Sequence, residues 1–226
     1  MFVTSVFDTS EALFGTARNL FQSTAQINTM MLSAILLPGG NTPRPLFQRI
    51  EENPFPVAPN FHIAYTDERL VPEQDPANNY AVSTAMLRAL NIPDAQILRV
   101  DTKLSLEAAA SDYNNAWKNF FERCGELPLA FLGLGSDGHT CSLFTAEQIA
   151  SYSDNCFAAA VLREEGTDRV TVTPALLSRI RHIVILVTGH SKAAIVNVMT
   201  NAPENVAAGM ALAGCSRVSI WYSAQE

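Results

Sequence analysis

The segment from Leu132 to Thr140 reads LGLGSDGHT and places Asp137 and His139 among three glycines. Histidine titrates near neutral pH, so His139 is suited to act as a general base in a reaction that removes a proton from water or from a substrate. A lone histidine is more often structural. Its position among glycines, directly after a predicted buried strand, favours a catalytic role, with Asp137 two residues away as a possible partner.

A second candidate segment, Pro38-Gly39-Gly40-Asn41-Thr42-Pro43, lies between a predicted strand and a predicted helix. Gly39 and Gly40 allow a ligand to come close to the backbone, while Asn41 and Thr42 supply hydrogen-bond donors. The N-terminus of the following helix offers unpaired N–H groups and partial positive charge. These features predict an anion-binding loop, although glycine pairs are also common in plain turns.

Charged residues follow other predicted strands. Asp67, Glu68 and Arg69 come directly after an apolar run, where an α/β enzyme places catalytic groups, although a surface salt bridge is the commoner reading. Arg169, by contrast, directly precedes the predicted strand at 170–172. Lys192 lies in the first turn of a predicted helix, where the helix dipole disfavours a cation. A bound phosphate would remove that conflict, whereas a lysine pointing into water would leave it in place.

The elements that must position these residues alternate along the chain. Strands are predicted at 3–7, 33–37, 61–65, 129–134, 156–162, 170–172, 183–187 and 218–222. Helices are predicted from an N-cap at Asp8 to about Asn28, and at about 43–50, 76–90, 106–121 and 191–199. This order predicts one α/β domain over residues 1–226, with a mostly parallel, Rossmann-like sheet and helices on both faces. In such a sheet the ligand lies at the carboxyl ends of the strands, where the candidate residues are.

Composition excludes several classes of protein. Apolar residues make up 48% of the 226 residues and charged residues 16%, which is typical of a folded domain. The net charge of −7 argues against nucleic-acid binding. The start of the chain does not resemble a signal peptide, and no apolar run is long enough to span a membrane, so we expect a cytoplasmic protein. The four histidines and four cysteines show no metal-ligand spacing, so neither a metal nor another cofactor is expected.

Taken in order, these segments resemble the 6-phosphogluconolactonase family, which shares its fold with glucosamine-6-phosphate isomerase/deaminase. The resemblance covers nearly the whole chain, and the most specific block is DGHTxSLF. The matching segments are Gly39–Pro43, Asp67–Pro72 with Asn78 and Asn79, Leu132–Phe144, Arg169–Thr173 and Thr188–Ala193. Pro38 stands where the family usually has serine, which removes one hydroxyl from the expected phosphate contacts.

The resemblance implies hydrolysis of 6-phosphogluconolactone to 6-phosphogluconate in the oxidative pentose phosphate pathway, so the expected partner is a phosphorylated sugar lactone. His139 would activate water, and Asp137 and Asp67 would orient His139 or hold sugar hydroxyls. The residues expected to hold the phosphate are Gly39, Gly40, Asn41, Thr42, Arg69, Arg169 and Lys192. None of the motifs specifies an oligomeric state.

Two alternatives remain. The first is a sugar-phosphate isomerase/deaminase, whose loop resembles DGHIAFNEP and carries an acid a few residues after the histidine. In this chain no carboxylate follows His139 until Glu147. The second is a non-catalytic sugar-phosphate sensor. A sensor is expected to have lost a residue of the catalytic loop, yet Asp137 and His139 are both present.

Overall fold

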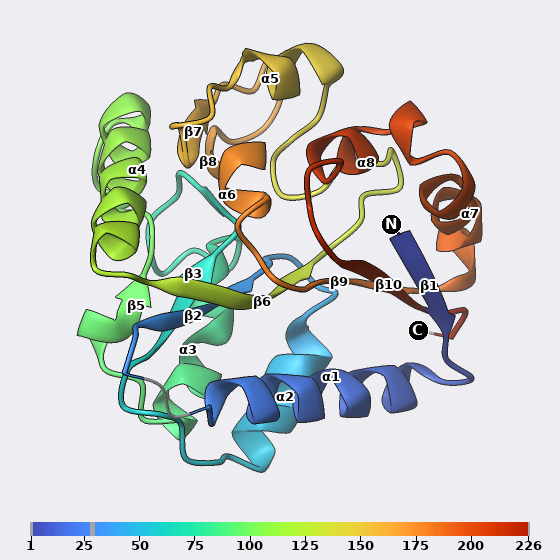
Figure 1. The fold of residues 1–226 in the computed structure, drawn as a ribbon, viewed down its shortest axis with the longest axis horizontal. Helices are drawn as coiled ribbons and strands as arrows, with labels where there is room; N and C mark the ends of the chain where they lie inside the picture. The colour runs from blue at the N-terminus through green and yellow to red at the C-terminus, as the bar shows by residue number, and fades with distance from the viewer. Residues whose placement is uncertain (1, 28–29, 226) are drawn as a thin grey trace.

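Strands and helices alternate along the chain in the computed structural model, which describes residues 2–27 and 30–225 (Figure 1). Seven strands form a sheet in which every neighbouring pair is parallel. In spatial order they are β1 (Phe2–Val6), β10 (Val218–Ser223), β9 (Ile183–Thr188), β6 (Glu126–Leu132), β2 (Ser33–Leu37), β3 (Phe61–Tyr65) and β5 (Ile97–Leu98). The predicted α/β fold with a mostly parallel sheet is therefore confirmed.

Helices cover both faces of this sheet (Figure 1). One face packs against α1 (Ser10–Ala25), α2 (Arg44–Glu52) and α3 (Asn79–Ala89). The other packs against α4 (Leu106–Glu122), α6 (Pro174–Leu177), α7 (Ala193–Asn201) and α8 (Ala207–Ala211). In β2, Ile35 and Leu37 point to the first face while Ala34 and Leu36 point to the second. Because both faces are covered, the central strands are apolar at most positions rather than at alternate ones.

Short helices complete the chain: α5 (Ala146–Ser151) and the 3₁₀ turns η1 (Asp94–Gln96), η2 (His190–Lys192) and η3 (Pro203–Asn205). Within the residues described, no helix combines the length and the apolar character needed to cross a membrane. The helix expected over 191–199 begins with the turn η2, so Lys192 lies at the N-cap of α7 rather than within its first turn.

A second sheet was not predicted. It is antiparallel, lies above the main sheet beside α4, and consists of β4 (Asp67–Arg69), β8 (Arg169–Val172) and β7 (Ala158–Val161) (Figure 1). The runs at 156–162 and 170–172 do contain strands, but these strands do not join the parallel sheet. The segment 67–69 follows β3 and was not predicted to be a strand. It forms a strand because the chain, one residue beyond β3, pairs with β8.

Two further helix starts differ from those predicted. Helix α1 is capped by Thr9 rather than Asp8, since the Thr9 hydroxyl accepts a hydrogen bond from the backbone N–H of Ala12 at 3.1 Å. This helix ends at Ala25, and the predicted end at Asn28 lies outside the described residues. Helix α3 begins at Asn79 rather than Pro76.

The start of α3 is shifted because Asn78 caps it. The Asn78 side chain accepts a hydrogen bond from the N–H of Ala81 at 3.0 Å, and the helical pattern begins only after that cap. The three residues before it form a turn, in which the N–H of Asn78 donates to the carbonyl of Asp75.

Tyr113 links α4 to the end of β3. Its hydroxyl donates to the carbonyl of Tyr65 at 2.6 Å and accepts from the N–H of Tyr65 at 3.3 Å, and the Tyr113 side chain is fully buried. We predict that Tyr113→Phe lowers the free energy of unfolding by about 1–3 kcal/mol, because it leaves buried backbone groups without a partner. Urea unfolding of the variant measures this. Tyr152→Phe is the control, because the hydroxyl of this partly exposed tyrosine accepts a hydrogen bond from the Gln148 side chain at 3.0 Å rather than contacting a buried backbone group. Equal stability of Tyr113→Phe and wild type would show that the hydrogen bonds between the Tyr113 hydroxyl and the Tyr65 backbone do not stabilise the fold.

Candidate functional site

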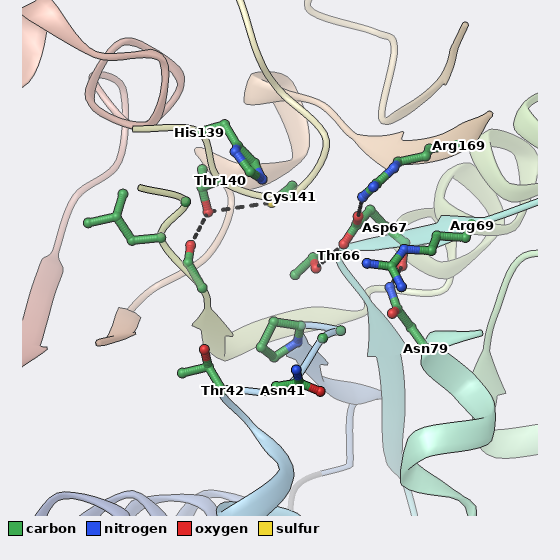
Figure 2. Close-up of a pocket in the computed structure, with 16 residues that line it drawn as sticks. Asn41, Thr42, Thr66, Asp67, Arg69, Asn79, His139, Thr140, Cys141 and Arg169 are labelled. Atoms are coloured by element: carbon green, nitrogen blue, oxygen red, sulfur yellow. Dashed lines mark hydrogen bonds and ion pairs between the residues drawn. The ribbon is translucent and has the colours of Figure 1, made fainter. Parts of the chain in front are cut away.

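A cavity of about 190 Å³ opens at the carboxyl ends of β2, β3 and β6. The adjacent strands β2 and β6 mark the point where the strand order reverses, since β3 follows β2 on one side and β9 follows β6 on the other. Ligands of open α/β sheets bind at such a point. The lining residues, drawn in Figure 2, are Pro38, Gly39, Gly40, Asn41, Thr42, Thr66, Asp67, Arg69, Asn79, Gly133, Leu134, Gly135, His139, Thr140, Cys141 and Arg169.

His139 and Asp137 form a hydrogen-bonded pair in the loop after β6. The Nδ1 atom of His139 lies 2.6 Å from Oδ1 of Asp137. Burial raises the pKa of Asp137, but the hydrogen bonds and charge of His139 lower it by more. The pKa of this carboxyl therefore lies below its usual value. An ionised Asp137 accepts the proton on Nδ1, and this leaves the lone pair of Nε2 free to take a proton.

The backbone of this loop is held by several contacts. The N–H of Gly135 donates to the carbonyl of His139 at 2.8 Å, and the Thr140 hydroxyl donates to the carbonyl of Gly133 at 2.8 Å. The ring of Phe144 lies 4.7 Å from the His139 ring, centroid to centroid. The loop therefore fixes both the position of the imidazole and the direction of its free nitrogen.

Because Gly135 has no side chain, the space next to it is available to the side chains of Asp137 and His139. A Cβ atom at this position would lie 2.2 Å from Nδ1 of His139 and 2.3 Å from Oδ1 of Asp137. Gly138 has φ of +84°, a conformation in which other residues are strained. Glycine is thus required at these two positions, for lack of space at one and for the backbone angle at the other.

The loop after β2 forms the lower wall of the cavity in Figure 2. Among the described residues, nothing accepts a hydrogen bond from the backbone N–H groups of Gly40, Asn41 and Thr42, which precede α2. Gly40 adopts φ of +82°. Gly39 packs directly against the side chain of Asn79, since a Cβ on Gly39 would lie 1.7 Å from the amide oxygen of Asn79. The loop can therefore donate several N–H groups to an anion.

Two arginines form the wall opposite this loop. Arg69 in β4 and Arg169 in β8 are directly paired residues of antiparallel strands, and like charges in such positions repel. The Arg169 side chain is 22% exposed, and its Nε atom is buried without a hydrogen-bond partner among the described residues. Burial lowers the pKa of Arg169, and the nearby Arg69 and Arg163 lower it further, whereas Asp67 raises it. A bound anion would relieve both the repulsion and the unpaired donor.

Asp67 lies beneath the arginines and does not contact His139. Its Oδ2 atom accepts a hydrogen bond from the Ser142 hydroxyl at 2.7 Å, and its Oδ1 atom accepts one from Thr66 at 3.0 Å. Arg169 lies 3.8 Å from Oδ2. Asp137 is thus the carboxylate that orients His139, whereas both oxygens of Asp67 are engaged in holding the cavity wall.

Lys192 is not among the residues that line the cavity. Its Nζ atom donates to the carbonyl of Leu134 at 2.8 Å, and Leu134 itself is a lining residue, so the ammonium group lies at the edge of the cavity wall. The other residues predicted for the site lie in or directly beside the cavity: Asp67, Arg69, Asp137, His139, Arg169 and the glycine loop at 39–42.

The sequence did not single out Thr66, Asn79, Thr140 or Cys141 as site residues, although each lines the cavity. Asn79 could have been found from the Asn-Asn pair at 78–79. Cys141 has φ of +54°, and burial raises the pKa of its thiol, which disfavours the thiolate form. In residues 2–27 and 30–225, no three histidine, cysteine or acidic side chains cluster in a way that could hold a metal ion.

Comparison with known proteins places this geometry in context. Residues 8–220 match the family described as glucosamine-6-phosphate isomerases/6-phosphogluconolactonase. A 6-phosphogluconolactonase of Synechocystis is 35% identical over 164 residues, which cover 70% of this chain and 67% of that protein. The human 6-phosphogluconolactonase is 30% identical over 217 residues, or 89% and 83% of the two chains. The structure of 6-phosphogluconolactonase from Trypanosoma cruzi superposes with a TM-score of 0.83 at 25% identity, covering 99% and 94% of the chains.

The contact between Gly135 and the Asp137–His139 pair yields a prediction. Gly135→Ala should separate the two side chains, because the added methyl group needs the space they occupy. In ¹H–¹⁵N spectra of the neutral His139 ring, wild type should carry its proton on Nδ1, while the variant should show a mixture of tautomers. Gly15→Ala, where an added Cβ meets nothing within 4 Å, is the control. An unchanged His139 signal in Gly135→Ala would rule out this constraint.

Proposed function

Because the chain belongs to the glucosamine-6-phosphate isomerase/6-phosphogluconolactonase family, we propose that it hydrolyses 6-phosphogluconolactone to 6-phosphogluconate in the oxidative pentose phosphate pathway. The observation that carries this proposal is one cavity in which an oriented imidazole, a loop with free N–H groups and two directly paired arginines face one another. The imidazole supplies a base for water, and the other two walls supply a grip for an anionic substrate.

In the proposed reaction, Nε2 of His139 removes a proton from water as the water oxygen attacks the lactone carbonyl carbon. The tetrahedral intermediate then expels the ring oxygen, which takes a proton from the imidazolium, so that a carboxylic acid and a hydroxyl are formed. Asp137 holds Nδ1–H throughout and stabilises the imidazolium. The ester bond of a δ-lactone is already reactive, so neither a covalent intermediate nor a cofactor is needed.

In this proposal the phosphate is held by two sets of groups: the backbone N–H groups that lack an acceptor in the free protein, and the two arginines that repel each other. The N–H groups of the loop at 39–42 and the guanidinium groups of Arg69 and Arg169 supply donors, and Lys192 adds positive charge behind Leu134. Arginine forms paired hydrogen bonds with phosphate oxygens. The missing hydroxyl at Pro38 leaves this grip to backbone groups and to the cations.

The positions of the carboxylates favour hydrolysis over isomerisation and deamination. Glu147, the first acid after His139, is exposed in the first turn of α5 and does not line the cavity. Asp67 does line it, but Ser142 and Thr66 occupy its two oxygens. A deaminase needs a free acid for ring opening and a base for moving a proton between carbons. Lactone hydrolysis needs one base, which His139 supplies.

The experiment that tests the function compares two substrates. Purified protein is mixed with freshly generated 6-phosphogluconolactone, and 6-phosphogluconate is measured against the spontaneous rate, with and without EDTA. A parallel reaction contains glucosamine 6-phosphate and is assayed for ammonia. We expect accelerated lactone hydrolysis that survives chelation, and no ammonia. Ammonia release without acceleration of hydrolysis would reverse the proposal, and activity lost to EDTA and restored by a metal would remove the metal-free mechanism.

His139→Asn should lower kcat for lactone hydrolysis by about 10²–10⁴-fold, because an amide cannot accept the proton of water as a base. The limb of the pH–rate profile that reflects the base should disappear. Circular dichroism and the melting temperature check that the variant is folded. His62→Asn, a histidine that contacts Asn60 and Phe120 away from the cavity, serves as the control. Near-normal turnover in folded His139→Asn would assign the base to another group.

Arg169→Gln should raise KM by about 10- to 100-fold with a smaller effect on kcat, since a charged hydrogen bond to a remote phosphate contributes about 1.5–3 kcal/mol to binding. Inorganic phosphate should raise the melting temperature of wild type more than that of the variant. The control is Arg179→Gln, because Arg179 packs over Phe121 and Phe157 outside the cavity. A fall in kcat at constant KM would show that Arg169 acts on the reacting atoms instead.

A further inference from the structure

Glu68 is a buried acid that lies beside the cavity without lining it. Glu68 is only 2% exposed, and its two carboxylate oxygens accept three backbone hydrogen bonds. Oε1 accepts from the N–H of Arg69 at 2.8 Å and from the N–H of Asn79 at 2.7 Å, and Oε2 accepts from the N–H of Tyr80 at 3.0 Å. Asn79 and Tyr80 are the first two residues of α3, so Glu68 joins the strand β4 to the N-terminus of this helix.

Both residues joined by this link contribute side chains to the cavity. The amide nitrogen of Asn79 donates to the carbonyl of Asp67 at 2.8 Å, and the same side chain packs against Gly39 of the loop after β2. The guanidinium of Arg69 donates to the carbonyl of Ala77 at 3.3 Å, just before α3. Figure 2 shows Arg69 and Asn79 next to each other on one side of the cavity.

Burial of this carboxyl carries a cost that the local contacts offset. Burial and the charge of Asp67 raise the pKa of Glu68, the three N–H groups lower it, and the net result is a pKa of about 7. The partial positive charge at the start of α3 also favours the ionised form. An uncharged amide in the same place could accept with one oxygen only and would direct its own N–H groups at a backbone donor.

We propose that Glu68 is a positioning residue, which fixes β4 against α3 and thereby holds Arg69 and Asn79 in place to bind the substrate. Glu68 touches no substrate atom in this proposal. The inference rests on the proposed hydrolysis, because Arg69 is assigned there to the phosphate. It predicts that the loss of Glu68 weakens binding and leaves the Asp137–His139 pair, on the opposite side of the cavity, in place.

The test is Glu68→Gln beside Glu73→Gln. Glu73 follows β4 as well, but it is paired with Arg99 outside the cavity, at 3.0 Å. Glu68→Gln should raise KM for 6-phosphogluconolactone by about 10-fold and leave kcat within about threefold, as expected for lost ground-state binding. The affinity for inorganic phosphate, measured by thermal shift, should fall by a similar factor. Glu73→Gln should match wild type in both assays.

A double-mutant cycle with Asn79→Ala separates positioning from general stability. Both residues belong to one link, so Glu68→Gln/Asn79→Ala should raise KM hardly more than either single change. Additive effects, or a loss of kcat at constant KM, would overturn the proposal, as would a folded Glu68→Gln that binds like wild type. If Glu68→Gln does not fold, Asn79→Ala alone tests the proposal. Unchanged KM and unchanged phosphate affinity in Asn79→Ala would then overturn the proposal. A wild-type protein that binds phosphate but does not hydrolyse the lactone would instead contradict the proposed function.

Discussion

The hydrogen bond between Asp137 and His139 is the interaction on which the rest of the site depends. It is possible only because Gly135 has no side chain, since a Cβ atom there would overlap both partners. Gly138, with its positive φ, turns the chain so that two residues separated by one position can face each other. The loop in turn requires a rigid support, which β6 supplies from the middle of a sheet covered on both faces.

The second sheet brings positive charge to the cavity that contains His139. Strands β4 and β8 place Arg69 and Arg169 opposite each other, although two like charges in such a pair repel. The carboxylate of Asp67 lies beneath them but also accepts hydrogen bonds from the hydroxyls of Thr66 and Ser142. The free protein thus has an electrostatic cost at the cavity that a bound anion would reduce. The cavity walls differ in origin: His139 and the N–H donors follow strands of the parallel sheet, whereas the arginines belong to the antiparallel one. Their relative position depends on contacts made through helices. Glu68 ties β4 to the start of α3, which packs on the parallel sheet, and Tyr113 ties α4 to the end of β3.

Local sequence patterns were enough to predict the parallel sheet, because short, mostly apolar runs such as 33–37 and 61–65 mark strands buried on both faces. They were also enough to single out His139 and the glycine loop, where unusual residue types stand at strand ends. The antiparallel sheet was not predicted, since β4 is three polar residues long and owes its conformation to pairing with the distant β8. The different environments of Asp67 and Asp137 also depend on long-range contacts, with Ser142 in one case and with the space at Gly135 in the other.

The central claim is that Asp137 and His139 act as one unit that activates water. A double-mutant cycle on kcat for 6-phosphogluconolactone hydrolysis, with Asp137→Asn, His139→Asn and the double variant, tests it most directly. The account predicts that Asp137→Asn lowers kcat in the presence of His139 and has almost no further effect once His139 is asparagine. Equal effects of Asp137→Asn in both backgrounds would show that the two residues act independently and would contradict the account.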